Sequence, residues 1–147
     1  MAAVKMDMEQ ARFNMIEQQI RPWEVLDPEV LDILAMVRRE VFVPEALKAL
    51  AFADLELPIG NGQTMLSPKI EARVLQEAGV RSTDIVLEVG SGSGYMAALL
   101  ASKAEYVHTV EIDPVLAETA RRNLRQAGVS NVSVEIGDAA RGWSGPS

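Results

Sequence analysis

Apolar positions recur at helical spacing through the first third of the chain. Residues 8–20 predict one helix, whose apolar face consists of Met8, Ala11, Phe13, Met15, Ile16 and Ile20. A second helix is predicted from Asp27, which fits an N-cap, and Pro28, which fits the first helical position. Its apolar stripe consists of Val30, Leu31, Leu34 and Val37. Residues 38–52 then pass through a break at Pro44 into another short helix.

From residue 81 the pattern changes to short apolar runs that alternate with helical segments. The runs at 84–90, 106–112 and 131–138 are typical of buried parallel strands. Helical patterns fill 93–104 and 113–128, and the second begins with Asp113 as N-cap and ends at Gly128. This order predicts right-handed crossovers and an α/β fold with a parallel sheet. We expect a helical N-terminal subdomain over 1–80, packed against an α/β half over 81–147.

Composition narrows the class of protein. The chain has 147 residues, enough for one domain, and is 48% hydrophobic and 24% charged, as an ordinary globular protein is. A net charge of −7 argues against a nucleic-acid or anionic-membrane partner held by bulk electrostatics. Without cysteine and with one histidine, the chain has neither disulfides nor a thiolate or multi-histidine metal site. No secretory leader or long apolar span is recognisable, so we expect a cytoplasmic protein and no membrane partner.

The strongest local signal is the stretch LEVGSGSGY at the end of the first predicted strand. Glu88 ends the strand, and Gly90, Gly92 and Gly94 alternate through the turn into a helix. Glycines allow a tight turn and the close approach of a ligand to the backbone. A dinucleotide-binding loop needs its third glycine at the position of Tyr95, which weakens a nicotinamide interpretation. Taken alone, the motif also fits a tight loop without a ligand.

Two further carboxylates follow the next two predicted strands. Glu111 lies 21 residues after Gly90, where a carboxylate accepts hydrogen bonds from ribose hydroxyls. Asp138 follows the third strand, where a carboxylate accepts from an adenine amino group. Either acid alone fits a solvated strand end or a turn. Ligands of open α/β sheets bind beyond the carboxyl ends of the strands, so the set predicts a nucleoside site.

This set resembles the class I methyltransferases that bind S-adenosyl-L-methionine. The resemblance implies a Rossmann-like three-layer sandwich in which the glycine loop holds the methionine part of the cofactor. Glu111 then holds the ribose and Asp138 reads adenine, with S-adenosyl-L-homocysteine as product. The cofactor-binding residues implied are Glu88, Gly90, Ser91, Gly92, Gly94, Glu111, Ile112, Asp138 and Ala139. An acidic pocket suits a sulfonium cation.

More motifs narrow the resemblance to the protein-L-isoaspartate O-methyltransferases. They run from about residue 8 to residue 143 and comprise MIEQQI, FVPEAL, LAFADLELPIGNGQT, LEVGSGSGY and GDAARGW. That family methylates the α-carboxylate of isoaspartyl residues in damaged proteins, which begins their repair. Isoaspartyl proteins or peptides are therefore the implied substrates. A carboxylate with a pKa of ~3.9 is ionised at neutral pH, so the reaction needs no general base.

The loop GNGQTMLSP departs from the family pattern G-Q-T-[small apolar]-S-x-P. The matching residues are Gly62, Gln63, Thr64 and Pro68. Leu66 stands where the family has a substrate-binding serine, and Ser67 stands one residue later. Ser67 also fits the N-cap of the helix that begins at Pro68, and Thr64 fits either a hydroxyl donor or an ordinary turn residue. Thr64 and Ser67 are the candidate catalytic residues, and a different methyl acceptor is the alternative.

The length of the chain is its second departure from the family pattern. The class I sheet has seven strands, whereas this chain supplies the first three and stops. The first strand is then left with a long apolar edge. We expect either a C-terminally truncated product or pairing with another chain, including a homo-oligomer formed through that edge. Two further alternatives are a non-catalytic module that only binds cofactor and a nicotinamide-binding domain.

Overall fold

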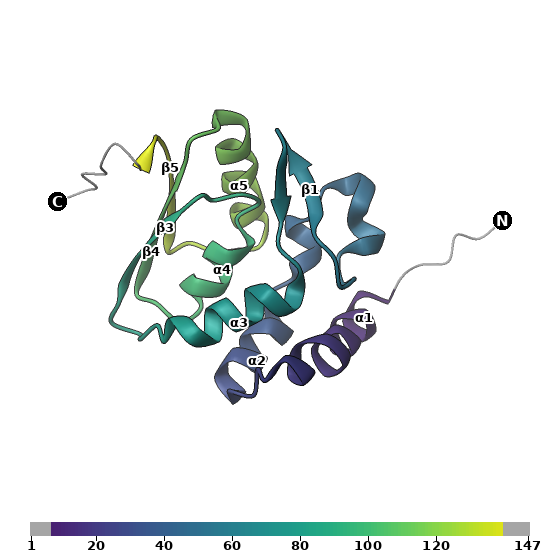
Figure 1. Ribbon diagram of the computed structural model, residues 1–147. Helices are drawn as coiled ribbons and strands as arrows, with labels where there is room; N and C mark the ends of the chain where they lie inside the picture. Colours follow the sequence, from purple (N-terminus) through teal and green to yellow (C-terminus); the bar gives the residue numbers. More distant parts are fainter. Residues whose placement is uncertain (1–6, 140–147) are drawn as a thin grey trace.

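The computed structural model describes residues 7–139. Helices and a β-hairpin form the N-terminal part, and a small parallel sheet with its own helices forms the C-terminal part (Figure 1). The last residues of the GDAARGW motif lie outside the described residues. Buried side chains from both parts form one continuous hydrophobic core, so the two parts pack directly against each other.

The N-terminal helices begin as the capping residues predict. Helix α1 (Met8–Met15) follows Asp7, and α2 (Pro28–Met36) follows Asp27, whose side chain accepts from the Glu29 N–H at 2.9 Å. After α1 come the π-helical turn η1 (Ile16–Ile20) and the 3-10 turn η2 (Arg21–Trp23). The prediction that Phe13 belongs to the buried face is wrong, because its side chain is 59% exposed. Phe13 precedes η1 and lies off the side of α1 on which Arg12 and Met15 are buried, whereas Ile20 at the end of η1 is buried.

The middle of the chain holds short elements and a hairpin. The 3-10 turns η3 (Arg39–Phe42) and η4 (Glu45–Leu50) lie on either side of Pro44. Strands β1 (Leu57–Gly60) and β2 (Gln63–Met65) pair antiparallel. Three consecutive residues with positive φ, 60–62, form their turn, a conformation that glycine and asparagine adopt most readily. Helix α3 (Pro68–Ala78) follows and ends at Gly79.

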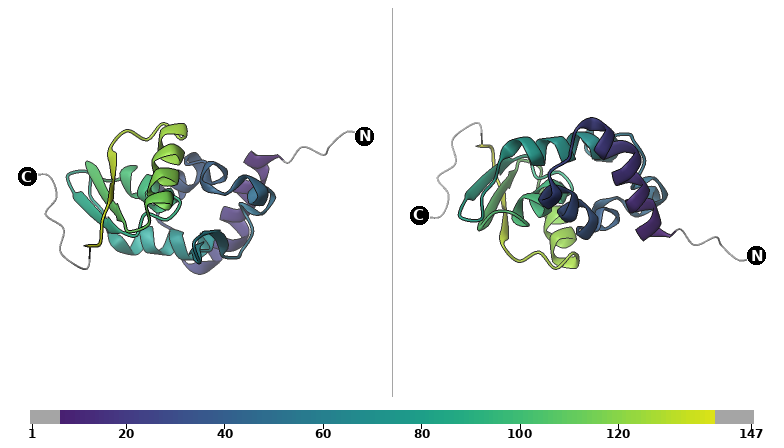
Figure 2. Two further views of the ribbon diagram at one scale, coloured as in Figure 1. Left: turned by 90° about the horizontal axis from the view of Figure 1, so that it is seen from above. Right: turned by 90° about the horizontal axis from the view of Figure 1, so that it is seen from below.

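The predicted parallel sheet is confirmed. Strands β3 (Ile85–Val89), β4 (Tyr106–Glu111) and β5 (Val132–Ile136) pair in the order β3-β4-β5. Helices α4 (Tyr95–Ala101) and α5 (Pro114–Gln126) connect them. Figure 2 shows both helices on the same side of the sheet. They cover the face that carries Val107, Thr109 and Val134, which are buried.

The opposite face and the β3 edge are open within the described residues. Side chains of Ile85, Leu87 and Val89 on that face are 56%, 46% and 68% exposed. Strand β3 has β4 as its one neighbour in the described part of the sheet. The apolar edge expected from the sequence is therefore present in residues 7–139.

Candidate active site

The three glycines of the loop after β3 share a backbone conformation but differ in their surroundings. All three have positive φ, at 88° for Gly90, 54° for Gly92 and 93° for Gly94. A Cβ on Gly90 would meet nothing within 4 Å, so this position faces open space. A Cβ on Gly94 would lie 3.3 Å from the Ala120 carbonyl oxygen and from the Leu124 side chain. Gly90 thus leaves room for a ligand, whereas Gly94 lets α4 pack closely against α5.

Glu111 fixes the conformation of this loop from the end of β4. Its carboxylate is buried, and one oxygen accepts from the Gly92 N–H at 3.0 Å. The other oxygen accepts from the Asp113 N–H at 3.1 Å. A carboxylate oxygen can accept a second hydrogen bond, so both oxygens can still receive ligand hydroxyls. The residue that the sequence assigns to the ribose therefore also organises the loop.

A cavity of about 320 Å³ lies over the carboxyl ends of the strands. Its lining residues from the sheet side are Val89, Gly90, Gly92, Val110, Glu111, Ile112, Gly137, Asp138 and Ala139. The hairpin covers it with Ile59, Gln63 and Thr64. Asn61 at the hairpin turn donates to Asp113 at 2.5 Å, which ties this cover to the start of α5. The side chain of Ile112 is 66% exposed beside the cavity and offers an apolar surface to a ring.

A second cavity of about 250 Å³ adjoins the first through the glycine loop. Glu88, Glu71, Ser91, Thr64 and Leu66 are among its lining residues. Thr109 donates its hydroxyl to Glu88 at 2.7 Å, and the Ser91 hydroxyl lies 2.7 Å from the same Thr109 oxygen. This second cavity therefore has a polar wall made by β3, β4 and the loop.

The two carboxyl groups that line the second cavity, Glu71 and Glu88, both have a raised pKa. Burial raises the pKa of Glu88 to about 7, against the hydrogen bond from Thr109. The neighbouring carboxylates of Glu71 and Glu111 raise it further. Burial also raises the pKa of Glu71 to about 7, opposed by the positive charge of Arg39. Perturbed carboxyl groups of this kind are concentrated at functional sites.

The cavities bring together most of the cofactor residues that the sequence predicts. The first cavity collects Gly90, Gly92, Glu111, Ile112, Asp138 and Ala139, and the second adds Glu88 and Ser91. Gly94 lines neither, because its position serves helix packing. These groups match a nucleoside with an aminoacyl part: carboxylates accept from hydroxyl and amino groups, the glycine backbone is open, and Ile112 offers an apolar side chain.

The two candidate catalytic residues differ in position. Thr64 lines both cavities, and its hydroxyl donates to Glu56 at 3.3 Å. Ser67 lines neither cavity, is 8% exposed and occupies the N-cap position of α3. Its hydroxyl makes no capping hydrogen bond within the described residues. A catalytic role of either residue stays a prediction, and Thr64 is the one placed to reach a ligand.

From the hairpin, the sequence predicts only Thr64 as a site residue. Ile59 and Gln63 line the first cavity, and neither was assigned a role. They belong to the stretch LPIGNGQT, which was used as a family motif and interpreted as a turn with a polar segment. The signal available was the pair of glycines around Asn61, typical of a hairpin turn.

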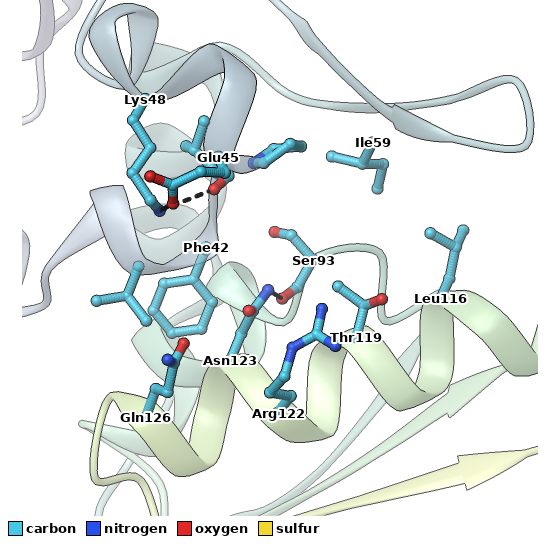
Figure 3. A pocket seen from close by; sticks show the side chains of 13 residues that line it. Phe42, Glu45, Lys48, Ile59, Ser93, Leu116, Thr119, Arg122, Asn123 and Gln126 are labelled. Carbon is cyan, nitrogen blue, oxygen red and sulfur yellow. Dashed lines mark hydrogen bonds and ion pairs between the residues drawn. The ribbon is translucent and has the colours of Figure 1, made fainter.

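A larger cavity of about 460 Å³ lies behind the glycine loop, between η3–η4 and α5 (Figure 3). Phe42, Leu116 and Arg122 are among its lining residues. Asn123 donates to the Ser93 carbonyl at 2.9 Å there, which supports the loop from the rear. None of the described residues that line it is a carboxylate at a strand end, so the nucleoside chemistry belongs to the two smaller cavities.

Within residues 7–139, no group of three or more His, Cys, Asp or Glu side chains is arranged to hold a metal ion. None of the helices in the same range has the length and apolar character that crossing a bilayer requires.

The parallel sheet, glycine loop and strand-end acids place the molecule among the Rossmann-like methyltransferase folds, and solved structures agree. A protein-L-isoaspartate O-methyltransferase structure superposes with a TM-score of 0.73 at 24% identity, over 90% of this chain and 42% of that chain. A putative protein-L-isoaspartate O-methyltransferase from Plasmodium falciparum, solved with S-adenosyl-L-homocysteine, gives a TM-score of 0.68 at 19% identity, over 88% and 62%. These likenesses show the fold.

Sequence comparison identifies the family. The model of the protein-L-isoaspartate(D-aspartate) O-methyltransferase family matches residues 10–147, so the chain belongs to this family. The protein-L-isoaspartate O-methyltransferase of Picosynechococcus sp. is 46% identical over 133 residues, which are 90% of this chain and 60% of that protein. The one of Petrotoga mobilis is 40% identical over 139 residues, which are 95% and 65%. The chain thus spans less than two thirds of the length of these relatives.

Proposed function

We propose that the chain binds S-adenosyl-L-methionine and takes part in methyl transfer to the α-carboxylate of L-isoaspartyl residues in damaged proteins. The observation that carries this proposal is the first cavity, in which Glu111 and Asp138 from two strand ends meet the open glycine loop. Family membership supports the same reaction.

Each wall of the two cavities suits one part of the cofactor. Glu111 would accept the ribose hydroxyls with lone pairs that the loop amides leave available. Asp138 would accept from the adenine amino group, and Ile112 and Ala139 would contact the adenosine. The backbone of Gly90 and Gly92, with Glu88 and Ser91, would hold the methionine part. S-Adenosyl-L-homocysteine would occupy the same walls as product.

The chemistry requires alignment more than proton transfer. When bound, the cofactor supplies a methyl group on a positively charged sulfur. An isoaspartyl carboxylate is ionised at neutral pH, so no side chain of the chain has to remove a proton. The hairpin and glycine loop enclose the second cavity, where exclusion of water strengthens the attraction between opposite charges. Thr64 lines this cavity, and its hydroxyl would orient an acceptor carboxylate.

Methyl transfer to a synthetic isoaspartyl peptide, compared with the same peptide containing normal aspartate, tests the acceptor. We expect labelling of the isoaspartyl peptide alone. Equal labelling of both peptides, or of neither while the cofactor binds, would refute the isoaspartyl substrate. Transfer to another carboxylate or hydroxyl is the competing function, motivated by Leu66 at the serine position. The substitution Leu66→Ser should raise isoaspartyl turnover if that hydroxyl is what the loop lacks.

The proposal also covers the partners of the chain, its cellular location and its self-association. The substrate is a protein, the location is cytoplasmic, and the net charge of −7 argues against a nucleic-acid partner. Self-association through the β3 edge is proposed because Ile85, Leu87 and Val89 are exposed there. Sedimentation velocity over a range of concentrations checks it, and a monomer at every concentration would rule it out. Cofactor binding without any turnover would favour a binding module.

A further inference from the structure

Arg39 is a buried cation whose contacts join four separate segments of the chain. Its side chain is 1% exposed at the start of η3. Nε donates to the Ala51 carbonyl at 2.7 Å, and Nη1 donates to Glu71 at 2.6 Å. Nη2 donates to the Leu66 carbonyl at 2.9 Å. The guanidinium therefore uses all three of its nitrogens to hold acceptors in fixed directions.

The same guanidinium also lies against the helix that follows the glycine loop. Its central carbon is 4.8 Å from the centroid of the Tyr95 ring, within the range of a cation–π contact. Tyr95 is the first residue of α4 and is 2% exposed. One side chain thus connects the loop between β2 and α3 to the element that carries the glycine turn.

The hydrogen bond from Arg39 to the Leu66 carbonyl restrains a segment that lines the second cavity. Thr64 in β2 and Leu66 in the loop after it line the second cavity, and Glu71 lines it as well. The Leu66 side chain is 42% exposed, so packing of that side chain fixes the loop only in part. A charge-assisted hydrogen bond to its carbonyl is the stronger restraint.

We propose that Arg39 is a positioning residue for methyl transfer, because its bond to the Leu66 carbonyl sets where residues 63–67, which comprise strand β2 and the two residues after it, lie over the second cavity. Glu71 holds the guanidinium in register, and the Tyr95 ring supports it from the side of the cofactor loop. The effect on turnover rests on the proposed methyl transfer, whereas the effect on the loop does not.

Arg12 offers a matched control. It is 2% exposed and lies 5.3 Å over the Phe52 ring, so its burial and ring contact resemble those of Arg39. Its ion-pair partners, however, are Glu9 and Glu40, and neither of them lines either cavity, whereas Glu71 and Leu66, the partners of Arg39, line the second cavity. Loss of either guanidinium should destabilise the protein. Only loss of the Arg39 guanidinium, and not loss of the Arg12 guanidinium, should make the loop between β2 and α3 more mobile.

The first measurement is amide hydrogen exchange of residues 57–67 in wild type, Arg39→Lys and Arg12→Lys. A lysine has one ammonium and cannot reproduce the three-way fork of Arg39. We expect exchange in this segment to speed up about tenfold or more in Arg39→Lys, beyond any change in global stability by urea unfolding. Arg12→Lys should change it only in proportion to its loss of global stability. Equal acceleration in both variants, or none in Arg39→Lys, overturns the proposal.

A replacement variant and a kinetic measurement also test the proposal. If Arg39→Lys does not fold, Glu71→Gln replaces it. Loss of the carboxylate that holds the guanidinium should accelerate exchange in residues 57–67 by a smaller factor. Unchanged exchange in this segment overturns the proposal.

In kinetics, Arg39→Lys should raise the KM for an isoaspartyl peptide about tenfold and change S-adenosyl-L-homocysteine affinity by less than about twofold. An unchanged KM contradicts positioning. A wild-type chain without isoaspartyl turnover refutes the proposed function, and the exchange comparison still decides the role of Arg39.

Discussion

Ionisation of Glu88 should make cofactor binding depend on pH near neutrality. Burial raises the pKa of this carboxyl to about 7, so at pH 6 the group is mostly protonated and at pH 8 mostly ionised. A cation in the adjoining cavities favours the ionised form. The sulfonium cofactor should therefore bind more tightly as the pH rises through about 7.

The size of the effect follows from the pKa. If binding requires ionised Glu88, the apparent Kd scales with one plus the ratio of protonated to ionised carboxyl. With a pKa of about 7, this factor is about 11 at pH 6 and about 1.1 at pH 8. Affinity should then improve about tenfold between these pH values, equivalent to about 1.4 kcal/mol.

Isothermal titration calorimetry with S-adenosylmethionine and S-adenosylhomocysteine at pH 6, 7 and 8 measures this dependence. The product lacks the positive sulfur, so its affinity should change less with pH. Glu88→Gln should remove most of the dependence, whereas Glu71→Gln should keep it with a midpoint at lower pH, because the Glu71 carboxylate raises the pKa of Glu88. A slope that survives in Glu88→Gln, or that disappears in Glu71→Gln instead, would refute the assignment to Glu88.

Three further outcomes are expected. The pKa of Glu88 is raised from 4.5 to about 7 in the folded state, so its contribution to stability is complete below pH 4.5 and is lost as pH rises through about 7. The free energy of unfolding in urea should therefore decline by at most about 3 kcal/mol over this range. Glu88→Gln should make it depend less on pH. Glu111→Gln keeps one acceptor for the loop amides but loses the charge, so the free energy of unfolding should fall by about 1–2 kcal/mol and cofactor affinity should drop in calorimetry; unchanged values would contradict its role. Gly94→Ala should cost about 1–3 kcal/mol, because φ is 93° and the new Cβ would press on α5; a neutral result in thermal unfolding would contradict the packing role.

The elements with strong local signals were predictable from the sequence. Asp27 and Asp113 with their following prolines mark helix starts, and each carboxylate accepts the expected backbone N–H. The strands around Glu88 and Glu111 could be recognised because parallel strands have continuous apolar runs. The expectation that the strand before Glu88 is buried is wrong for the described residues, in which one face of β3 is exposed. The candidate cofactor-binding residues could be chosen at the strand ends, since the topology of a parallel sheet brings these ends together.

Long-range contacts could not be predicted in the same way. The β1–β2 hairpin is short, and its strands lack a clear alternation, so its role as a cover over the cavity emerges only in three dimensions. Arg39 and Glu71 lie 32 residues apart, and no periodicity indicates that they form a buried pair. Ser67 has the sequence of a capping residue, yet its hydroxyl makes no cap bond within residues 7–139, because capping depends on a rotamer that local sequence does not fix.

The central claim is that the strand ends of this chain form a cofactor site. Calorimetric titration of the purified chain with S-adenosyl-L-homocysteine, repeated with Asp138→Ala, tests it most directly. We expect saturable binding of one ligand per site that the substitution weakens about tenfold or more, as for loss of a charged hydrogen-bond acceptor. Competition by NAD should be absent. A folded chain that does not bind, or that binds equally well without the Asp138 carboxylate, would contradict the account.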